Sequence, residues 1–354
     1  MKKALIAMSG GVDSSVAAYF MKEQGYDCIG ATMRLFENED AGISKEKTCC
    51  SLDDVEDARQ VANRLNMPYY VMNFTADFRS EVIDRFTCAY EAGATPNPCI
   101  DCNRYLKFER LFMRGIELGC DYIVTGHYAR IEEKDGRFLL KKAVDPGKDQ
   151  SYVLYSLTQA QLAHTLFPLG EFSKTQIRHI AEEHGFVNAR KHDSQDICFV
   201  PDGDYAAAIT RFTGKTYPCG DFTDQEGHCL GQHKGIIRYT IGQRRGLGLS
   251  LPESLYVCKK DMVHNTVILG KNEALFSSSL DAKDFNWIAF DAPASPIRAK
   301  ARVRYQQKEQ WATITPTSPD TIHLEFDELQ RAITSGQAVV LYEDDLVVGG
   351  GTIL

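Results

Sequence analysis

The sequence predicts an α/β protein, with a parallel sheet covered by helices on both faces, followed by a small, mainly β central domain and a C-terminal β-barrel. Apolar runs of strand length alternate with helix-period segments in the first half. A glycine-rich turn joins the first such run to the first helical segment. Beyond residue 200, short strand-like runs are broken by Gly, Pro and Asp. We therefore expect three domains, over residues 1–200, 201–273 and 274–354.

The first half contains four expected strands and two expected helices. Helical spacing is clearest where Val55, Ala58, Ala62 and Leu65 recur on one face. The expected strands are residues 4–8, 28–33, 69–74 and 122–125, and the expected helices are 14–23 and 52–65. Ligands of such a sheet bind at the carboxyl ends of its strands.

The second half has the pattern of antiparallel β domains or barrels. A short helix is expected over 205–212. The expected strands are residues 235–241, 255–259, 299–304, 312–315 and 338–342.

Composition places the 354-residue chain among cytoplasmic proteins. No apolar run reaches the ~18 residues of a membrane helix, and the apolar stretch within residues 1–8 is too short for a signal peptide. The 11 cysteines are scattered through the chain, which argues against a small disulfide scaffold. We expect Cys28, Cys88 and Cys120 in the core. The net charge of −8 does not indicate a nucleic-acid binder, although local basic clusters still could.

The strongest local signal is the segment from Ser9 to Ser15, SGGVDSS, between the first strand and the first helix. Glycines allow a tight turn, and a helix N-terminus offers N–H groups and a positive dipole end to a phosphate. Serine hydroxyls add further donors. The segment lacks the ending of a Walker A loop. The alternative is an ordinary strand–turn–helix capped by Asp13 or Ser14.

The string SGGVDSS resembles the PP-loop of the N-type ATP pyrophosphatases, whose fold is adenine nucleotide alpha hydrolase-like. That superfamily cleaves ATP to AMP and pyrophosphate while adenylating a substrate oxygen. It also includes GMP, argininosuccinate and NAD synthetases, so this loop alone leaves the substrate open.

Further segments resemble the bacterial and mitochondrial tRNA-specific 2-thiouridylases, and the resemblance spans nearly the whole chain. Their joint occurrence in one order is more specific than any one of them. The segments are TPNPCIDCN (95–103), TGHYAR (125–130), KDQSY (148–152), DSQDICFV (193–200), GQRRGLG (242–248) and RVRY (302–305).

This resemblance implies a sulfurtransferase that uses ATP with Mg²⁺ and acts on the wobble uridine of tRNA. The C2 oxygen becomes adenylated, a cysteine persulfide delivers sulfur, and AMP leaves. Cys198 would carry the persulfide and Cys102 would act as nucleophile, and the pair could close into a disulfide. A cysteine desulfurase or a sulfur-relay protein would supply the sulfur. The implied ATP-binding residues are Met8, Ser9, Gly10, Gly11, Val12, Asp13, Ser14, Ser15, Met33 and Gly126.

Cys102 is expected just before a helix, near Arg104 and Lys107, where its pKa would be lowered. Cys99 departs from the family pattern, in which many members have an aspartate, a proposed base. The departure creates a Cys99-x-x-Cys102 spacing. With Cys198 these thiols could instead hold an iron–sulfur cluster, a second hypothesis. No other metal ligands are predicted.

Asn97, Pro98 and Cys99 are implied to line the pocket of the target base, which must leave its stack to react. The implied tRNA contacts are His127, Lys148, Asp149, Gln150, Arg304, Tyr305 and Gln337. Two basic rows add to these: Arg104, Lys107, Arg110 and Arg114 at helical spacing, and Arg298, Lys300, Arg302 and Arg304 at strand spacing. Such rows suit phosphate contacts.

Two other functions remain open from the residues. A small-molecule synthetase of the same superfamily would explain the loop but not the spaced Cys102 and Cys198. An RNA-binding redox or metal sensor would explain the thiols and basic residues without catalysis.

Overall fold

The computed structural model describes residues 1–36, 52–192, 197–200 and 202–354. Its first part contains a five-stranded, all-parallel sheet, as expected. In spatial order the strands are β3 (Tyr69–Asn73), β2 (Asp27–Arg34), β1 (Lys3–Ala7), β4 (Tyr122–Val124) and β7 (Thr165–Leu166). The carboxyl ends of β1, β2 and β4 therefore lie side by side.

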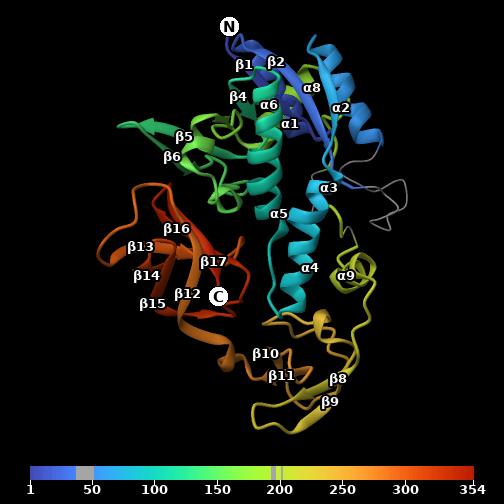
Figure 1. Ribbon diagram of the computed structural model, residues 1–354, viewed down its shortest axis with the longest axis vertical. Helices are drawn as coiled ribbons and strands as arrows, with labels where there is room; N and C mark the ends of the chain where they lie inside the picture. Colours follow the sequence, from blue (N-terminus) through green and yellow to red (C-terminus); the bar gives the residue numbers. More distant parts are fainter. Residues whose placement is uncertain (37–51, 193–196, 201) are drawn as a thin grey trace.

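Helices cover both faces of this sheet, which confirms the predicted fold class (Figure 1). One layer contains α1 (Val12–Glu23), α2 (Leu52–Arg64) and α8 (Lys174–Glu183). The other contains α6 (Leu111–Glu117), which packs on β1 and β4. Nearly continuous apolar burial on β1 reflects this double covering.

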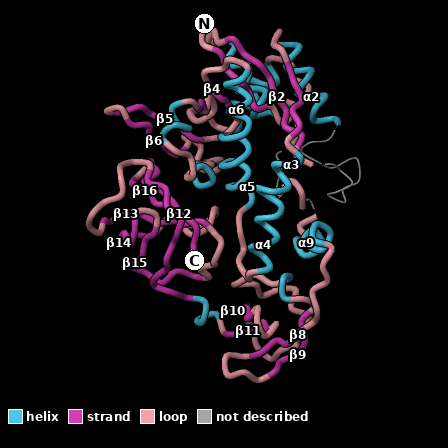
Figure 2. Tube along the Cα trace, in the orientation of Figure 1, coloured by secondary structure: helices cyan, strands magenta, loops and turns pink. Residues whose placement is uncertain are grey.

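A helical column joins the sheet to the second half of the chain (Figure 2). Two of its segments are π-helices, η1 and η2. The column contains α3 (Thr75–Phe78), η1 (Arg79–Ile83), α4 (Asp84–Glu91), α5 (Pro98–Asp101), η2 (Cys102–Arg110) and α6. Cys28 and Cys120 are buried as predicted, but Cys88 is exposed. Its prediction was wrong because α4 buries the opposite face, with Phe86, Thr87 and Tyr90.

The central part follows α9 (Tyr205–Thr213) and forms a four-stranded sheet ordered β10-β11-β8-β9. The strands are β8 (Gly220–Thr223), β9 (Cys229–His233), β10 (Tyr256–Asp261) and β11 (Thr266–Gly270). The strand expected over 235–241 is absent from this described segment, which contains the 3₁₀ helix η4 (Ile236–Arg238). Ile236 and Ile237 are both buried, so the side chains do not alternate as a strand requires.

The last part is a six-stranded antiparallel barrel, closed by pairing of β12 with β17. Its strands are β12 (Phe276–Trp287), β13 (Ile297–Arg302), β14 (Gln310–Ser318), β15 (Thr321–Arg331), β16 (Ala338–Glu343) and β17 (Leu346–Ile353). A hairpin from the first part, β5 (Ala129–Lys134) and β6 (Arg137–Lys142), extends this sheet through a pairing of Leu346 with Lys141. The sequence did not predict this connection.

Three further short elements complete the described chain. They are η3 (Ser151–Leu154), α7 (Gln159–Ala163) and η5 (Asn272–Leu275). Within the described residues, no helix is long and apolar enough to cross a membrane.

Candidate nucleotide site and cysteine pair

The segment Met8–Gly11 turns sharply between β1 and α1. Gly10 has φ +75°, and a Cβ there would lie 2.3 Å from the backbone oxygen of Asp54. Only glycine fits this turn, because both its φ and the close approach exclude a side chain. Gly11 occupies the N-cap of α1 and offers no side chain to the first N–H groups. The helix start can therefore receive an anion.

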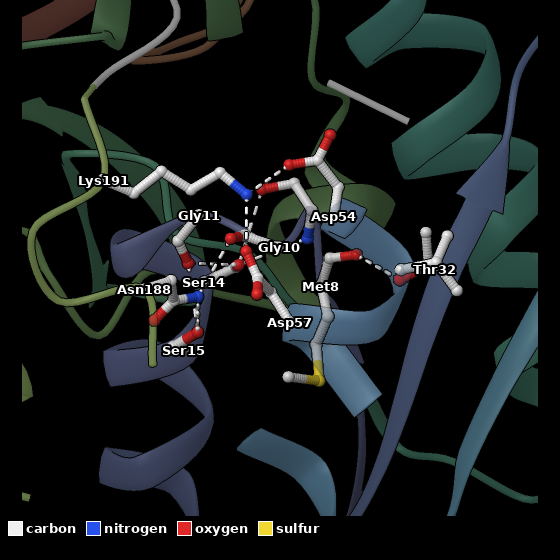
Figure 3. Close-up of polar contacts among 12 residues, drawn as sticks. Met8, Gly10, Gly11, Ser14, Ser15, Thr32, Asp54, Asp57, Asn188 and Lys191 are labelled. Carbon is white, nitrogen blue, oxygen red and sulfur yellow. Dashed lines mark hydrogen bonds and ion pairs between the residues drawn. The ribbon is translucent and has the colours of Figure 1, made fainter. Parts of the chain in front are cut away.

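The serine hydroxyls shape the loop from within. Ser14 Oγ donates to Gly11 O (3.0 Å) and accepts from Ser9 N (3.2 Å), and Ser15 Oγ also donates to Gly11 O (3.1 Å). Figure 3 shows this network around Gly11. Because each hydroxyl has one proton, Ser14 and Ser15 do not donate to a phosphate in this state.

Two residues of the segment 188–191, distant in sequence from the loop, contact the loop and the neighbouring helix α2 (Figure 3). Asn188 Nδ2 donates to Gly10 O and to Ser15 Oγ, both at 2.9 Å. Lys191 Nζ bridges Asp54 Oδ1 (2.5 Å) and Asp57 Oδ2 (2.6 Å) on α2. The contacts of Asn188 with the loop and of Lys191 with α2 were not predicted from the sequence.

Asp13 is held by two side chains that sequence analysis also missed. Lys174 Nζ lies 2.8 and 2.7 Å from its two carboxylate oxygens, and Tyr128 OH donates to Oδ1 (2.7 Å). Lys174 is the first residue of α8, after Ser173, which forms a capping box with Gln176. That box was readable in the sequence as a helix start, but it did not indicate what Lys174 contacts.

The expected nucleotide residues Met33 and Gly126 lie at the carboxyl ends of β2 and β4, the strands on either side of β1. A Cβ on Gly126 would be 2.8 Å from the backbone of Asp13, so the end of β4 packs against the start of α1. Met33 is half-buried near the end of β2. Preceding it, Thr32 Oγ1 donates to Met8 O (2.6 Å). The implied ATP-binding residues therefore gather at the carboxyl edge of the sheet, where α/β proteins bind ligands.

The target-base segment begins a helix. Asn97 is the N-cap of α5 and accepts from Cys99 N (3.1 Å), Pro98 is buried, and Cys99 is exposed. Burial raises the pKa of neighbouring Asp101 to about 6, against the opposing effects of Arg85 and Arg104. Asp101 Oδ1 lies 4.0 Å from Arg85 Nε.

Cys102 differs from expectation. The helix begins at Pro98 and continues through η2, so Cys102 lies one turn inside it and not at its N-terminus. Burial raises the pKa of the Cys102 thiol, Lys107 lowers it by a smaller amount, and Asp101 raises it further. The predicted low pKa was wrong because desolvation of the thiolate outweighs the nearby lysine.

Cys198 follows the segment 193–196, which lies outside the described residues. Cys198 and Cys102 are both half-buried and pack against the same hydrophobic core. That core contains Phe199, whose ring lies 5.6 Å from Phe78 and 5.3 Å from Phe86. No disulfide bond joins any two cysteines of the described residues.

Thiolate chemistry at Cys99, Cys102 and Cys198 would suit an iron–sulfur cluster. Among the described residues, their sulfur atoms do not form a group within 4.8 Å of one another, whereas Asp224, Glu226 and His228 on an exposed turn do form such a group. The three thiols therefore do not make a compact site for a single ion.

His127 is buried and packs against the rings of Phe108 and Phe167, and its Nδ1 lies 2.7 Å from Thr125 Oγ1. Burial, and to a smaller extent Lys107, hold the pKa of His127 well below its ordinary value. The ring is therefore neutral at physiological pH, which removes the charge that a phosphate contact would use.

Several implied tRNA residues are brought together from distant parts of the chain. Tyr305 OH donates to Asp149 O (3.0 Å), so residues 148–150 and 304–305 lie together. Gln150 Oε1 accepts from Tyr128 N (3.0 Å). Gln337 Nε2 donates to Thr95 O (2.5 Å), which joins a barrel loop to the target-base segment.

The basic rows are largely paired within the protein. Arg304 donates to the carbonyls of Ile241 and Ala332 and to Thr334 Oγ1. The other pairs are Lys107–Asn103, Arg110–Asp77, Arg114–Glu117, Arg298–Asp327 and Arg302–Glu309. The i→i+5 bonding of η2 also changes the helical spacing from which a single face was predicted.

These features define an α/β protein with a glycine-rich loop at the carboxyl edge of a parallel sheet and with two cysteines packed against one hydrophobic core. Three family models match the chain: tRNA methyl transferase HUP domain over residues 2–202, tRNA methyl transferase PRC-barrel domain over 209–271, and aminomethyltransferase beta-barrel domain over 277–353.

The chain is also similar to curated proteins named "tRNA-specific 2-thiouridylase MnmA". It is 51% identical to that of Clostridioides difficile, over 99% of this chain and 98% of the relative. It is 50% identical to that of Clostridium acetobutylicum, over 99% of each chain. The chain belongs to the MnmA family of tRNA-specific 2-thiouridylases.

Among solved structures, a 4-thiouridine synthetase–RNA complex with bound ATP aligns with a TM-score of 0.36 and 20% identity, over 56% of this chain and 45% of that one.

Proposed function

We propose that this protein is an ATP-dependent tRNA sulfurtransferase that converts the wobble uridine to 2-thiouridine. The observation that carries the proposal is the arrangement of the glycine loop at the N-terminus of α1, at the sheet edge where Gly126 and Met33 also lie. In the proposed first step the C2 oxygen of uridine attacks the α-phosphorus of ATP, and pyrophosphate leaves. Adenylation turns a poor leaving group into AMP.

In the proposed second step, the terminal sulfur of a persulfide on Cys198 attacks C2 and AMP leaves. Cys102 attacks the inner sulfur on Cys198, which frees the thiolated base and leaves a Cys102–Cys198 disulfide. An external thiol must then reduce that disulfide. Support comes from the packing of both cysteines against one core. A desulfurase or relay protein would load Cys198, and Mg²⁺ would accompany ATP.

We further propose that residues 1–200 perform the chemistry while 201–273 and 274–354 hold the anticodon arm. Contacts between Gln337 and Thr95, and between Tyr305 and Asp149, support a substrate surface shared by the first and last of these parts.

The test is nucleoside mass spectrometry of tRNA incubated with the protein, ATP, Mg²⁺ and a persulfide source. We expect 2-thiouridine at the wobble position, dependent on ATP. Pyrophosphate release with a small substrate and no thiolation would instead identify a synthetase, and ATP-indifferent RNA binding would identify a sensor. Iron and visible absorbance in anaerobically purified protein would favour the iron–sulfur hypothesis, and their absence would reject it.

A further inference from the structure

The ion pair between Lys174 and Asp13 lies at the edge of the proposed phosphate site. Lys174 contacts both carboxylate oxygens, and its side chain is only 11% exposed. Asp13 belongs to the first turn of α1, the helix whose N-terminus faces the loop. Tyr128, just after the end of β4, donates to the same carboxylate. Three elements thus converge on one acidic side chain.

The position of Asp13 creates an electrostatic conflict. The N-terminus of a helix favours one anion, and the carboxylate already occupies the first turn that a polyphosphate would approach. Two anions there repel each other unless a cation compensates one of them.

The position of Lys174 is not explained by its own helix. It lies in the first turn of α8, where the helix dipole disfavours a cation. A lysine ammonium this buried requires an anionic partner, and Asp13 provides it. The ion pair therefore links α8 to the phosphate loop, and it does not stabilise the N-terminus of α8.

We propose that Lys174 is a positioning residue of the nucleotide site. It neutralises Asp13 and holds the carboxylate toward α8 and Tyr128, so that a nucleotide polyphosphate meets the N-terminus of α1 without a competing anion. The inference rests on the proposed use of ATP and assigns a role to a residue outside the SGGVDSS loop.

The test compares ligands that share adenosine and differ in charge. Binding of ATP, AMP and adenosine is measured by calorimetry in EDTA, so that metal binding by Asp13 does not contribute. We expect Lys174→Met to weaken ATP binding about tenfold or more, the effect of one uncompensated charge in a partly exposed site. AMP should be affected less, and adenosine by no more than about twofold. A disturbed loop would weaken all three equally, and that outcome would overturn the proposal.

Lys215→Met is the matched control. Lys215 Nζ lies 2.8 Å from Oε1 of Glu91, the last residue of α4, away from the loop (Figure 1). Lys215→Met therefore also removes one positive charge and one ion pair. We expect it to leave all three affinities unchanged. Lys174→Arg, which keeps the charge, should retain ATP affinity within about threefold.

The double variant Asp13→Asn with Lys174→Met removes both charges together and should bind ATP nearly as well as Asp13→Asn alone. It also remains informative if Lys174→Met does not fold, because it removes both charges of the Asp13–Lys174 pair together. A double variant as weak as Lys174→Met, or a Lys174→Met that binds ATP normally, would overturn this inference alone. Wild-type protein that binds no ATP would overturn the proposed function as well.

Discussion

Cys102 and Cys198 are the residues on which sulfur transfer is proposed to depend. Replacing either with serine should abolish 2-thiouridine formation while ATP-dependent pyrophosphate release persists, because the loop does not involve these thiols. Nucleoside mass spectrometry and a pyrophosphate assay measure the two steps separately. Cys88→Ser, at an exposed cysteine of α4, is the control and should leave both steps intact. Thiolation that survives Cys102→Ser would remove the nucleophile from the scheme.

Burial of Cys102 predicts a pH dependence that can be measured directly. Its pKa is raised, so the thiolate fraction at pH 8 is smaller than for an ordinary cysteine and grows as pH rises further. Alkylation by iodoacetamide should therefore be slower at Cys102 than at exposed Cys99, and its rate should still be climbing above pH 9. Peptide mass spectrometry across pH 7 to 10 follows both residues in one sample. Equal rates at every pH would contradict the burial argument.

At the scale of elements, the periodicity of apolar residues predicted the positions of individual strands and helices. The strands β1, β2, β3 and β4 and the helices α1 and α2 lie within one or two residues of their expected positions. For β1 and α1 the reason is that each buries the apolar residues that the pattern marks. Contacts between distant segments left no such pattern. The joining of β6 to β17 and the ion pair of Lys174 with Asp13 are of this kind.

In the candidate site, likewise, the local sequence motif was predicted, and a property that depends on tertiary packing was not. SGGVDSS could be recognised because glycine, serine and helix start occur together in seven residues. The pKa of Cys102 was mispredicted because burial depends on η2 packing into the core, which short-range spacing does not encode. The prediction placed the start of this helix one turn too late. It therefore assigned the positive end of the helix dipole to Cys102, whereas the helix begins beside Cys99.

The turn between β1 and α1 permits a matched pair of glycine substitutions. Gly10→Ala should lower ATP affinity at least tenfold and reduce stability, because its Cβ would meet the Asp54 backbone at 2.3 Å. At Gly25 (φ +80°) a Cβ would have no atom of the described residues within 4 Å, its chain neighbours aside, so Gly25→Ala should show only the backbone penalty of about 1–2 kcal/mol. Calorimetric titration and thermal melting of both variants measure the difference. Equal losses of ATP affinity would show that close packing at Gly10 is irrelevant to the site.

For the whole molecule, the main consequence of the fold is that the proposed substrate surface is composite. Thr95 N donates to Ser335 O (2.9 Å), and a Cβ on Gly336 would lie 3.0 Å from Ala94. The barrel therefore buttresses the segment that leads to Asn97 and Cys99, more than 200 residues away in sequence. An RNA bound across this junction would contact both parts, whereas ATP at the sheet edge would contact only the first.

This separation predicts that a substitution in the barrel can raise the KM for tRNA without changing the affinity for ATP. Gln337→Ala removes the hydrogen bond to Thr95 O, a net stabilisation of about 1 kcal/mol. We expect the KM for tRNA to rise about fivefold, while ATP affinity stays unchanged. Gln307→Ala is the control, since Gln307 donates to Gln330 within the barrel and not across the junction. Steady-state thiolation assays with varied tRNA, beside ATP titrations, separate the two effects. If both variants raise the KM equally, general loosening of the barrel is responsible; if Gln337→Ala weakens ATP binding instead, the junction supports the nucleotide site and the division of the substrate surface is wrong.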